Sequence, residues 1–178
     1  MSKKLKPFTL WLTGISASGK TTLAKKIIEK LNMHDSLSEF LLVDGDEIRN
    51  TMSFYQYNNI GREKIGLLKA EMAEEENKKG KNVIVTGIAA KAKWRKDYRK
   101  IIENYYEVYL CCSLEACVKR DYKNQYKKAI DGDIGNFGGV TDDYEEHDEV
   151  DLKINTETST IEKSTIILFN FIQTIKSH

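Results

Sequence analysis

The sequence predicts an α/β protein in which a parallel β-sheet is flanked by helices on both faces. Short apolar runs rich in β-forming residues alternate with longer segments of helical periodicity along most of the 178 residues. A glycine-rich turn also lies between the first apolar run and the first helical segment. The chain contains one proline and no repeat or low-complexity block, so we expect residues 1–178 to form a single domain.

Five apolar runs are expected to form the strands of this sheet. They are Phe8–Thr13, Phe40–Val43, Val83–Thr86, Val108–Cys111 and Leu152–Ile154. Helical patterns separate most of them, and strands joined through crossover helices run parallel. The carboxyl ends of these strands should therefore meet at one edge of the sheet, where ligands of open α/β sheets bind.

Five segments show the apolar spacing of helices. They are Lys20–Leu31, Arg62–Lys79, Trp94–Asn104, Leu114–Tyr122 and Thr160–Ile175. The last segment follows Ser159, with Glu162 three residues later, which is the pattern of a capping box. Two stretches, 50–61 and 123–148, show no clear period. Because long irregular segments in a compact domain are commonly lids or binding loops, we expect the second substrate there, with a lid over about 121–148.

The charge balance argues against several classes of partner. Lys and Arg total 28 and Asp and Glu total 27, so no global field marks a nucleic-acid or membrane partner, and we expect a small molecule instead. No apolar stretch reaches the ~20 residues that span a bilayer, and no apolar segment follows the N-terminal lysines, so the expected location is cytoplasmic. The three cysteines lack metal-site spacing and are expected to be reduced thiols.

Residues 14–22 read G-I-S-A-S-G-K-T-T and contain a complete G-x-x-x-x-G-K-[ST] phosphate-binding loop (P-loop). A predicted strand precedes the motif and a helical pattern follows it, which is the context that the motif requires. The glycines let successive N–H groups point at phosphate oxygens, while Lys20 contacts the β and γ phosphates and the Thr21 hydroxyl binds magnesium. The predicted ATP-binding residues are Gly14, Ser16, Ala17, Ser18, Gly19, Lys20, Thr21 and Thr22. The motif therefore predicts ATP and Mg²⁺ as cofactors.

Residues 43–46 read V-D-G-D and follow the second predicted strand, at the same sheet edge as the P-loop. A carboxylate there can hold magnesium or its water, or accept the proton of a hydroxyl nucleophile. Aspartate and glycine also make ordinary turns, so the motif alone is a weak signal. Arg49 follows where a helical turn from Glu47 would direct its guanidinium toward an anionic substrate. The position favours a role in phosphoryl transfer and leaves open whether Asp44 or Asp46 is the base.

Three longer blocks occur in a set order along the chain. They are W-L-T-G-I-S-A-S-G-K-T-T-L-A from Trp11, V-D-G-D-E-I-R from Val43 and Y-K-K-A-I-D-G-D-I-G-N-F-G-G-V from Tyr126. Together they resemble the adenylyl-sulfate (APS) kinase family over most of the chain, from Trp11 to about Tyr144. The resemblance implies a homodimeric kinase with a P-loop NTPase-type fold. It would transfer the γ-phosphate of MgATP to the 3′-hydroxyl of adenosine 5′-phosphosulfate.

The resemblance also implies roles for individual residues. Lys20, Asp46 and Arg49 would be the catalytic residues, and Thr21 and Asp46 would hold the metal. Arg120 would lie at the ATP site, where the lid begins. The residues implied to bind the acceptor nucleotide are Asp44, Arg49, Arg62, Ile88, Ala89, Lys123, Lys127 and Phe137.

The departures from the family pattern lie on the acceptor side. Residues 61–68 keep Arg62 but lose the family's aspartate, asparagine and later arginine pair. The family's I-S-P segment reads I-A-A at 88–90, so no phosphoserine can form there, and F-T-G-I reads F-G-G-V from Phe137. Phe137 would still stack on the acceptor base. The candidates for an opposing aromatic ring are Phe54, Tyr55 and Tyr57.

These departures leave two acceptors open. One is APS, and the other is cytidine diphosphoramidate, which relatives of APS kinase in capsule gene clusters phosphorylate. The altered 61–68 segment and the Ala89-Ala90 pair favour the second somewhat, and the block from Tyr126 favours neither. A non-catalytic NTP-binding switch protein is disfavoured, because it would not need an acceptor set such as D-G-D, Arg49 and Phe137.

Overall fold

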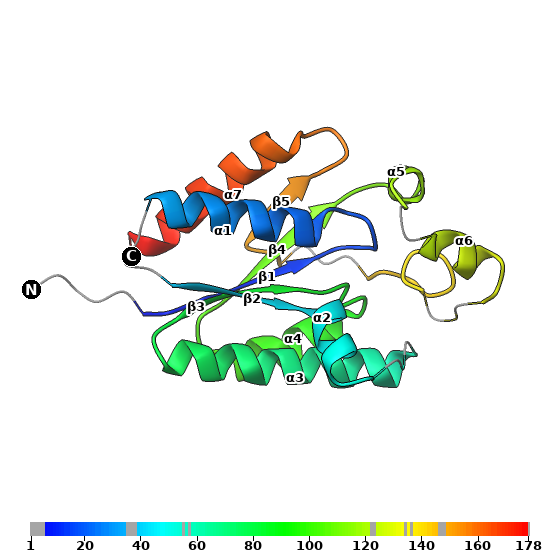
Figure 1. The fold of residues 1–178 in the computed structure, drawn as a ribbon, viewed down its shortest axis with the longest axis horizontal. Coiled ribbons are helices and arrows are strands. Elements are labelled where there is room, and N and C mark those ends of the chain that lie inside the picture. Colours follow the sequence, from blue (N-terminus) through cyan, green and yellow to red (C-terminus); the bar gives the residue numbers. More distant parts are fainter. Residues whose placement is uncertain are drawn as a thin grey trace, which may run out of the picture.

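The computed structural model describes residues 6–34, 39–54, 56, 58–121, 124–133, 135, 137–145 and 149–177. Its centre is a five-stranded parallel β-sheet with the strand order β2-β3-β1-β4-β5 (Figure 1). The strands are β1 (Thr9–Thr13), β2 (Phe40–Asp44), β3 (Asn82–Thr86), β4 (Tyr105–Cys111) and β5 (Leu152–Asn155). Every strand expected from an apolar run is present, and all neighbouring pairs are parallel, so the predicted sheet is confirmed.

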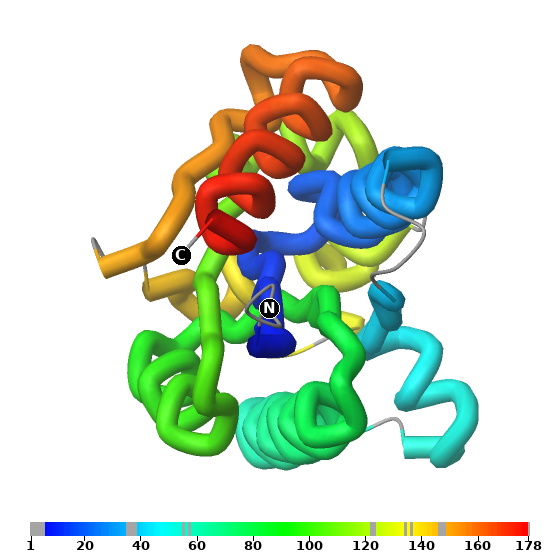
Figure 2. The backbone as a smooth tube through the Cα atoms, turned by 90° about the vertical axis from the view of Figure 1, so that its left-hand side faces the viewer, coloured from blue at the N-terminus to red at the C-terminus, as the bar shows by residue number. Residues whose placement is uncertain are grey.

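Helices cover both faces of the sheet, as Figures 1 and 2 show. The helices α1 (Lys20–His34) and α7 (Ile161–Lys176) lie on one face, and α3 (Asn59–Lys78) and α4 (Ala92–Ile101) lie on the other. Side chains of β1 alternate between the layers: Leu10 packs with α1 and α7, and Trp11 packs with α3 and α4. Because β1 is buried along its whole length, its sequence reads as one apolar run rather than as an alternation. Within the described ranges, no helix has the length and apolar character needed to cross a membrane.

Three short helices lie beyond the carboxyl ends of the strands. They are α2 (Gly45–Thr51), α5 (Leu114–Lys119) and α6 (Gln125–Ile130). An apolar cluster joins the P-loop to this region. Its buried members are Ile15, Cys117, Tyr126, Ala129 and Phe137. The predicted lid segment is therefore packed against the P-loop in this structure.

Several predicted helix boundaries need correction. Helix α3 begins at Asn59 rather than Arg62, and α4 ends at Ile101 rather than Asn104. Helix α7 is capped by Thr160, whose Oγ1 accepts a backbone N–H at 3.2 Å, and not by Ser159. The helix predicted over 114–122 ends at Lys119, because the Asp121 carboxylate accepts the first N–H groups of α6 at 3.0 and 2.7 Å. The irregular stretch predicted over 123–148 thus contains α6, which its short length and mixed charge concealed.

The three cysteines lie at the end of β4 and on α5. Cys111 and Cys112 are half-buried and Cys117 is buried, and all three are free thiols, as predicted. Burial raises the pKa of the Cys117 thiol to about 12. Cys117 therefore serves as a small apolar side chain in the cluster beside the P-loop.

Candidate active site

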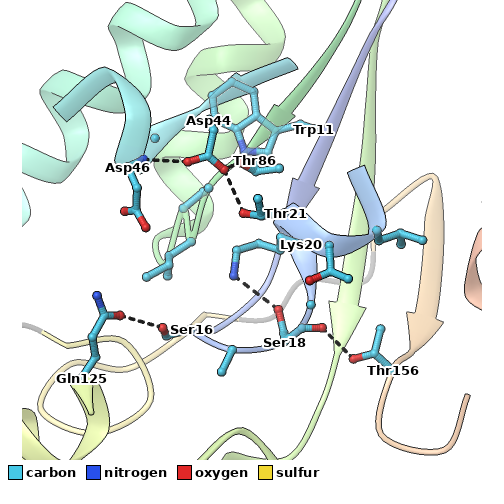
Figure 3. A pocket seen from close by; sticks show the side chains of 18 of the residues that line it. Trp11, Ser16, Ser18, Lys20, Thr21, Asp44, Asp46, Thr86, Gln125 and Thr156 are labelled. Carbon is cyan, nitrogen blue, oxygen red and sulfur yellow. Dashed lines mark hydrogen bonds between the residues drawn. The ribbon is translucent and has the colours of Figure 1, made fainter. Parts of the chain in front are cut away.

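A pocket of about 710 Å³ opens at the carboxyl ends of the strands (Figure 3). The P-loop and the start of α1 form one side of it, and α2, α3 and the segment after β3 form the other. The predicted site residues that line it are Ser16, Ala17, Ser18, Gly19, Lys20, Thr21, Thr22, Asp44, Asp46, Arg49, Arg62, Ile88, Ala89, Arg120 and Phe137. Gly14 and Lys127 do not line it, and Lys123 lies outside the described residues. The fold thus brings the two predicted sets, for ATP and for the acceptor, into one cavity.

The P-loop backbone requires glycine at two positions. Gly14 has a φ of +146°, and a Cβ there would lie 2.6 Å from Leu110 O, so no side chain fits. Gly19 has a φ of +96°, which residues with a Cβ rarely adopt. Ala17 also has a positive φ, of 56°, although it carries a Cβ. Strained backbone of this kind is typical of turns that bind ligands.

The Lys20 ammonium lies within the P-loop (Figure 3). It donates hydrogen bonds to Gly14 O at 2.9 Å, to Ile15 O at 2.6 Å and to Ser18 Oγ at 3.3 Å. Burial lowers the pKa of Lys20 to about 8, and nearby acidic groups oppose this shift. Most Lys20 side chains are therefore protonated at neutral pH, and a positive charge is held where the loop N–H groups would bind phosphate.

Asp44 and Asp46 occupy different environments. The Asp44 carboxylate accepts hydrogen bonds from Thr21 Oγ1 at 2.8 Å and Thr86 Oγ1 at 2.7 Å, and it caps α2 by accepting the Asp46 N–H at 2.9 Å. Burial acts to raise the pKa of Asp44, but these hydrogen bonds outweigh it and hold that pKa below its usual value. Asp46 is exposed and lines the pocket from the first turn of α2 (Figure 3). Asp44 thus joins the P-loop to β3 and α2, and Asp46 is the carboxylate that a substrate reaches more freely.

Two arginines predicted to face the acceptor line the pocket from the α2 and α3 side. Arg49 is buried, and its Nη1 donates to Gln56 O at 2.8 Å. Its guanidinium also lies 5.9 Å from the centroid of the Phe54 ring. Arg49 therefore holds the segment between the two helices in place. Arg62 lines the pocket from the beginning of α3.

The segment after β3 is held through its carbonyl groups. Thr13 Oγ1 donates to Ile88 O at 2.7 Å, and Arg95 Nη1 donates to Ala89 O. Ala89 has a φ of +44°, which is uncommon for a residue with a Cβ. Arg95 Nη2 donates in turn to Glu145 O, at the far end of the predicted lid segment. Arg95 therefore connects the segment predicted to contact the acceptor with the end of the lid segment.

Arg95→Met is expected to destabilise the protein by about 3 to 5 kcal/mol. Arg95 Nε lies 3.1 Å from Glu107 Oε1, and both side chains are 1% exposed. Burial raises the pKa of Glu107 to about 7 against the opposing effect of Arg95, so denaturant unfolding at about pH 8 compares the variant with a wild type in which this carboxylate is mostly ionised. Without the guanidinium, a buried carboxylate is left without its cation, and two chain carbonyls lose their donor.

Arg99→Met is the matched control for this variant, because Arg99 lies one turn later in α4 with a side chain that is 43% exposed. Its ion pair with Asp151 lies at the surface, and its loss should change the free energy of unfolding by less than ~1 kcal/mol. Equal losses in the two variants would contradict the assigned role of Arg95.

The predicted lid segment contacts the P-loop through α6. Ser16 Oγ donates to Gln125 Oε1 at 3.1 Å (Figure 3), and Tyr126 OH donates to Ser16 O at 2.8 Å. Phe137 is 3% exposed, and its ring packs edge-on against Tyr126 with the centroids 5.0 Å apart. The Phe137 ring is therefore packed against α6 beside the P-loop, and the residue lines the pocket. Tyr55 and Tyr57, two candidates for an opposing ring, lie outside the described residues.

Lys127, which the resemblance implies to bind the acceptor, does not line the pocket in this structure. It is exposed and outside the pocket, whereas its neighbour Lys128 lines the pocket. One residue turns a side chain by about 100° around a helix axis, so the neighbour faces the cavity instead. Arg120 does line the pocket, and its Nη2 donates to Thr156 O at 3.0 Å.

The sequence analysis missed further pocket residues, among them Lys69, Thr86, Gln125 and Thr156. Lys69 lies two helical turns after Arg62, so helical periodicity alone places both on one face of α3. Thr86 ends β3 directly opposite Asp44 in the sheet. Gln125 and Thr156 reach the P-loop from distant segments, and no local pattern marks them.

A comparison with protein-family models matches residues 6–155 to the family described as adenylylsulphate kinase. The chain belongs to the adenylylsulphate kinase family. This membership confirms the resemblance carried by the three sequence blocks, all of which lie inside the matched range. The protein is therefore a kinase that uses ATP and transfers a phosphoryl group to a hydroxyl.

Individual members of the adenylylsulphate kinase family and of its fold agree with this assignment. The cytidine diphosphoramidate kinase of Campylobacter jejuni is 37% identical over 152 residues, which cover 85% of this chain and 88% of that protein. A probable adenylyl-sulfate kinase of Aeropyrum pernix is 34% identical over 179 residues, with 96% and 94% coverage. The structure of the Mycobacterium tuberculosis APS kinase CysC in complex with AMPPNP and APS matches with a TM-score of 0.87 at 26% identity, covering 95% of this chain and 99% of that one. The relatives thus include kinases named for two different acceptors.

Proposed function

We propose that the protein transfers the γ-phosphoryl group of MgATP to the 3′-hydroxyl of adenosine 5′-phosphosulfate. The main support is that one pocket contains Lys20 of the P-loop, the exposed Asp46 carboxylate, and Arg49 and Arg62 on the opposite side. Phosphoryl transfer depends on such a convergence, because positioning and charge stabilisation provide most of the catalysis. The similar M. tuberculosis kinase was solved with AMPPNP and APS together.

In this proposal, each group of pocket residues has a distinct role in the transfer. The P-loop N–H groups and Lys20 hold the phosphates and stabilise the charge that develops during transfer. Asp46 accepts the proton of the attacking hydroxyl, while Arg49 and Arg62 orient the anionic end of the acceptor. Asp44 supports both sides, because its hydrogen bonds join the P-loop to β3 and α2.

Mg²⁺ fits the oxygen donors at this edge of the sheet. Thr21 Oγ1 lies 2.8 Å from Asp44 Oδ2, and the Asp46 carboxylate lines the same pocket. Hydroxyl and carboxylate oxygens are the ligands that Mg²⁺ prefers. We propose that Thr21 and Asp46 hold the ion, directly or through water. When bound, Mg²⁺ would neutralise charge on the β and γ phosphates.

Cytidine diphosphoramidate is the second candidate acceptor. Two observations favour it: residues 61–68 lack most of the polar groups that the family places there, and the C. jejuni kinase named for this compound is 37% identical. Both acceptors are nucleotides with an anionic 5′ tail, so the catalytic residues would act on either in the same way. The difference lies in the base and in the terminal group of the tail.

A coupled ADP-release assay with APS, cytidine diphosphoramidate, AMP and CMP tests the proposal. Mass spectrometry of the product should show one added phosphate, and NMR should place it on the 3′-oxygen. High kcat/KM with APS supports the first candidate, and high kcat/KM with the cytidine compound alone supports the second. Turnover with the true acceptor should collapse in Arg49→Ala and Arg62→Ala. A folded enzyme that binds ATP and phosphorylates none of the four would contradict the proposal.

We further propose that residues 1–178 fold as one domain and assemble as a homodimer, as the resemblance implies. Light scattering coupled to size-exclusion chromatography should then give twice the 20.5 kDa chain mass. A single mass of 20.5 kDa at all protein concentrations would contradict the dimer.

Phe137→Ala is expected to raise the KM for the acceptor by about 5 to 150-fold and to leave the KM for ATP nearly unchanged. Phe137 lines the pocket, and stacking of a base on an aromatic ring is worth ~1 to 3 kcal/mol. Steady-state ADP release at varied ATP and at varied acceptor measures the two KM values.

Phe137→Leu serves as the matched control, because it keeps an apolar side chain in the cluster with Ile15 and Tyr126 but has no aromatic face. It should reproduce most of the increase in acceptor KM. If leucine restored wild-type values, packing rather than stacking would explain the alanine result. Equal weakening of ATP and acceptor would place Phe137 in the general packing of the lid segment.

A further inference from the structure

Lys69 is a buried cation in the wall of the pocket. Its side chain reaches in from α3, the residue is 4% exposed, and its Nζ donates a hydrogen bond to Thr86 O at 2.7 Å. In the part of the chain that the structure describes, Lys69 forms no ion pair and no second hydrogen bond. An ammonium group has three protons to donate, and a buried charge without a partner is unfavourable. The side chain therefore has unused donor capacity inside a ligand-sized cavity.

The space around this ammonium is created by glycine. A Cβ at Gly87 would lie 2.4 Å from Lys69 Nζ, and a Cβ at Gly45 would lie 3.4 Å from it. Any side chain at position 87 would thus displace the ammonium from its place. The two glycines follow β3 and β2 directly, so Lys69 Nζ lies at the carboxyl edge of the sheet, where the P-loop kinase binds its substrates.

A second buried hydrogen-bond donor, the indole N–H of Trp11, lies near Lys69. Trp11 is fully buried, and its Nε1 has no hydrogen-bond acceptor among the described residues. That nitrogen lies 3.7 Å from the position that a Cβ of Gly87 would take, and Lys69 Nζ lies 5.0 Å from the centroid of the Trp11 ring. Both residues line the pocket. The Trp11 N–H has no acceptor among the described residues, and the Lys69 ammonium has protons left to donate beyond its bond to Thr86 O. Together they indicate a place for a negatively charged group.

The charged groups around Lys69 do not compensate for the burial of its ammonium. Burial lowers the pKa of Lys69 to about 7, the carboxylates of Asp44 and Asp46 act to raise it, and Arg49 and Lys20 act to lower it further. The effects of the cations and the carboxylates on the pKa of Lys69 thus oppose one another, and burial is the main cause of its lowering. A bound anion would supply the missing partner and favour the charged form.

We infer that Lys69, together with the Trp11 indole N–H, binds the terminal anionic group of the acceptor's 5′ tail and so selects the modified nucleotide over its monophosphate. The inference rests on the proposed function and adds a residue that recognises the terminal group of the acceptor's 5′ tail. Lys69 shares a face of α3 with Arg62 and directly follows positions 67 and 68, where the family's arginine pair is missing. A site built to bind a substrate group discriminates against the analogue that lacks it, because its own polar groups are then left unpaired.

Calorimetric binding in the presence of AMPPNP tests the inference without requiring turnover. Two pairs of nucleotides are compared: APS with AMP, and cytidine diphosphoramidate with CMP. For the pair that contains its true acceptor, the wild-type protein should bind the modified nucleotide at least ~10-fold more tightly than the monophosphate. Lys69→Met should reduce this ratio to near one and change the Kd of AMPPNP by less than about twofold. Lys78→Met, at the exposed end of the same helix, should keep the wild-type ratio.

Two further measurements separate binding from a structural role. Lys69→Met should unfold at the same temperature as the wild type or at a higher one, because a buried charge is replaced by an apolar chain of similar length. Gly87→Ala keeps the lysine but displaces its ammonium, and it should lose the same discrimination.

The inference is overturned if Lys69→Met and Gly87→Ala keep the wild-type ratio, or if they weaken AMPPNP as much as the acceptor. It is also overturned if Lys69→Met fails to fold while Gly87→Ala retains full discrimination, or if the wild type itself does not discriminate. Failure of the proposed function gives a different result, namely no ADP release by the wild type with either acceptor.

Discussion

Lys20→Ala is expected to lower kcat by about 100-fold or more, with both substrates saturating. The ammonium of Lys20 is held inside the P-loop by Gly14 O, Ile15 O and Ser18 Oγ, so its position is set before any nucleotide binds. A preorganised charge of this kind stabilises the transferring phosphoryl group without reorganisation, and its loss should cost ~3 kcal/mol of transition-state stabilisation. Steady-state ADP release measures the change.

Lys26→Ala is the matched control on the same helix. Lys26 is 54% exposed, forms a surface ion pair with Glu29 at 2.9 Å and does not line the pocket. Its removal should leave kcat within about twofold of the wild type. A folded Lys20→Ala enzyme with kcat close to that of Lys26→Ala would show that the P-loop lysine has no role in transfer.

Asp46→Asn should likewise lower kcat by about 100-fold or more, because asparagine keeps the shape of the side chain but cannot accept the hydroxyl proton. Asp46 is exposed to the pocket, and its backbone N–H rather than its carboxylate takes part in the cap of α2. The substitution should therefore leave the fold largely intact. Single-turnover measurement of the transferred phosphate separates the chemical step from product release.

The neighbouring Glu47 provides the control for Asp46. It lies in the same first turn of α2 and is also exposed, but it does not line the pocket. Glu47→Gln removes one carboxylate from the same turn and should retain near wild-type kcat. If the two variants lost activity equally, general electrostatics at the start of α2 would explain the effect, and Asp46 would not be the base.

Local signals predicted the sheet and the P-loop kinase fold correctly. The strands were visible as apolar runs because both faces of the sheet are covered, so burial acts on every position of β1 and β3. The P-loop was visible because its function requires particular residues at fixed spacing: Gly14 and Gly19 for backbone reasons, and Lys20 for its charge. Such requirements act within a few residues and therefore leave a pattern in the sequence.

The parts of the site that were not predicted depend on contacts between distant segments. The pair of Arg95 and Glu107 is fully buried, yet charged residues in a sequence normally indicate an exposed surface. A shift of one residue along α6, about 100° around its axis, decides whether Lys127 or Lys128 lines the pocket. Lys69 had a periodic relation to Arg62, but only packing shows that its ammonium is buried.

Sequence patterns alone identify this protein as a P-loop kinase of the adenylylsulphate kinase family, because phosphate binding and strand burial impose local patterns. It also showed that the acceptor side departs from that family at residues 61–68 and 88–90. The packing of distant segments was needed to show that Lys69 Nζ lies in the pocket against Gly87, beside a Trp11 N–H that has no acceptor among the described residues. The reason is physical, since the environment of a buried charge is set by α3, β1 and β3 meeting at one corner, and no single segment encodes that meeting.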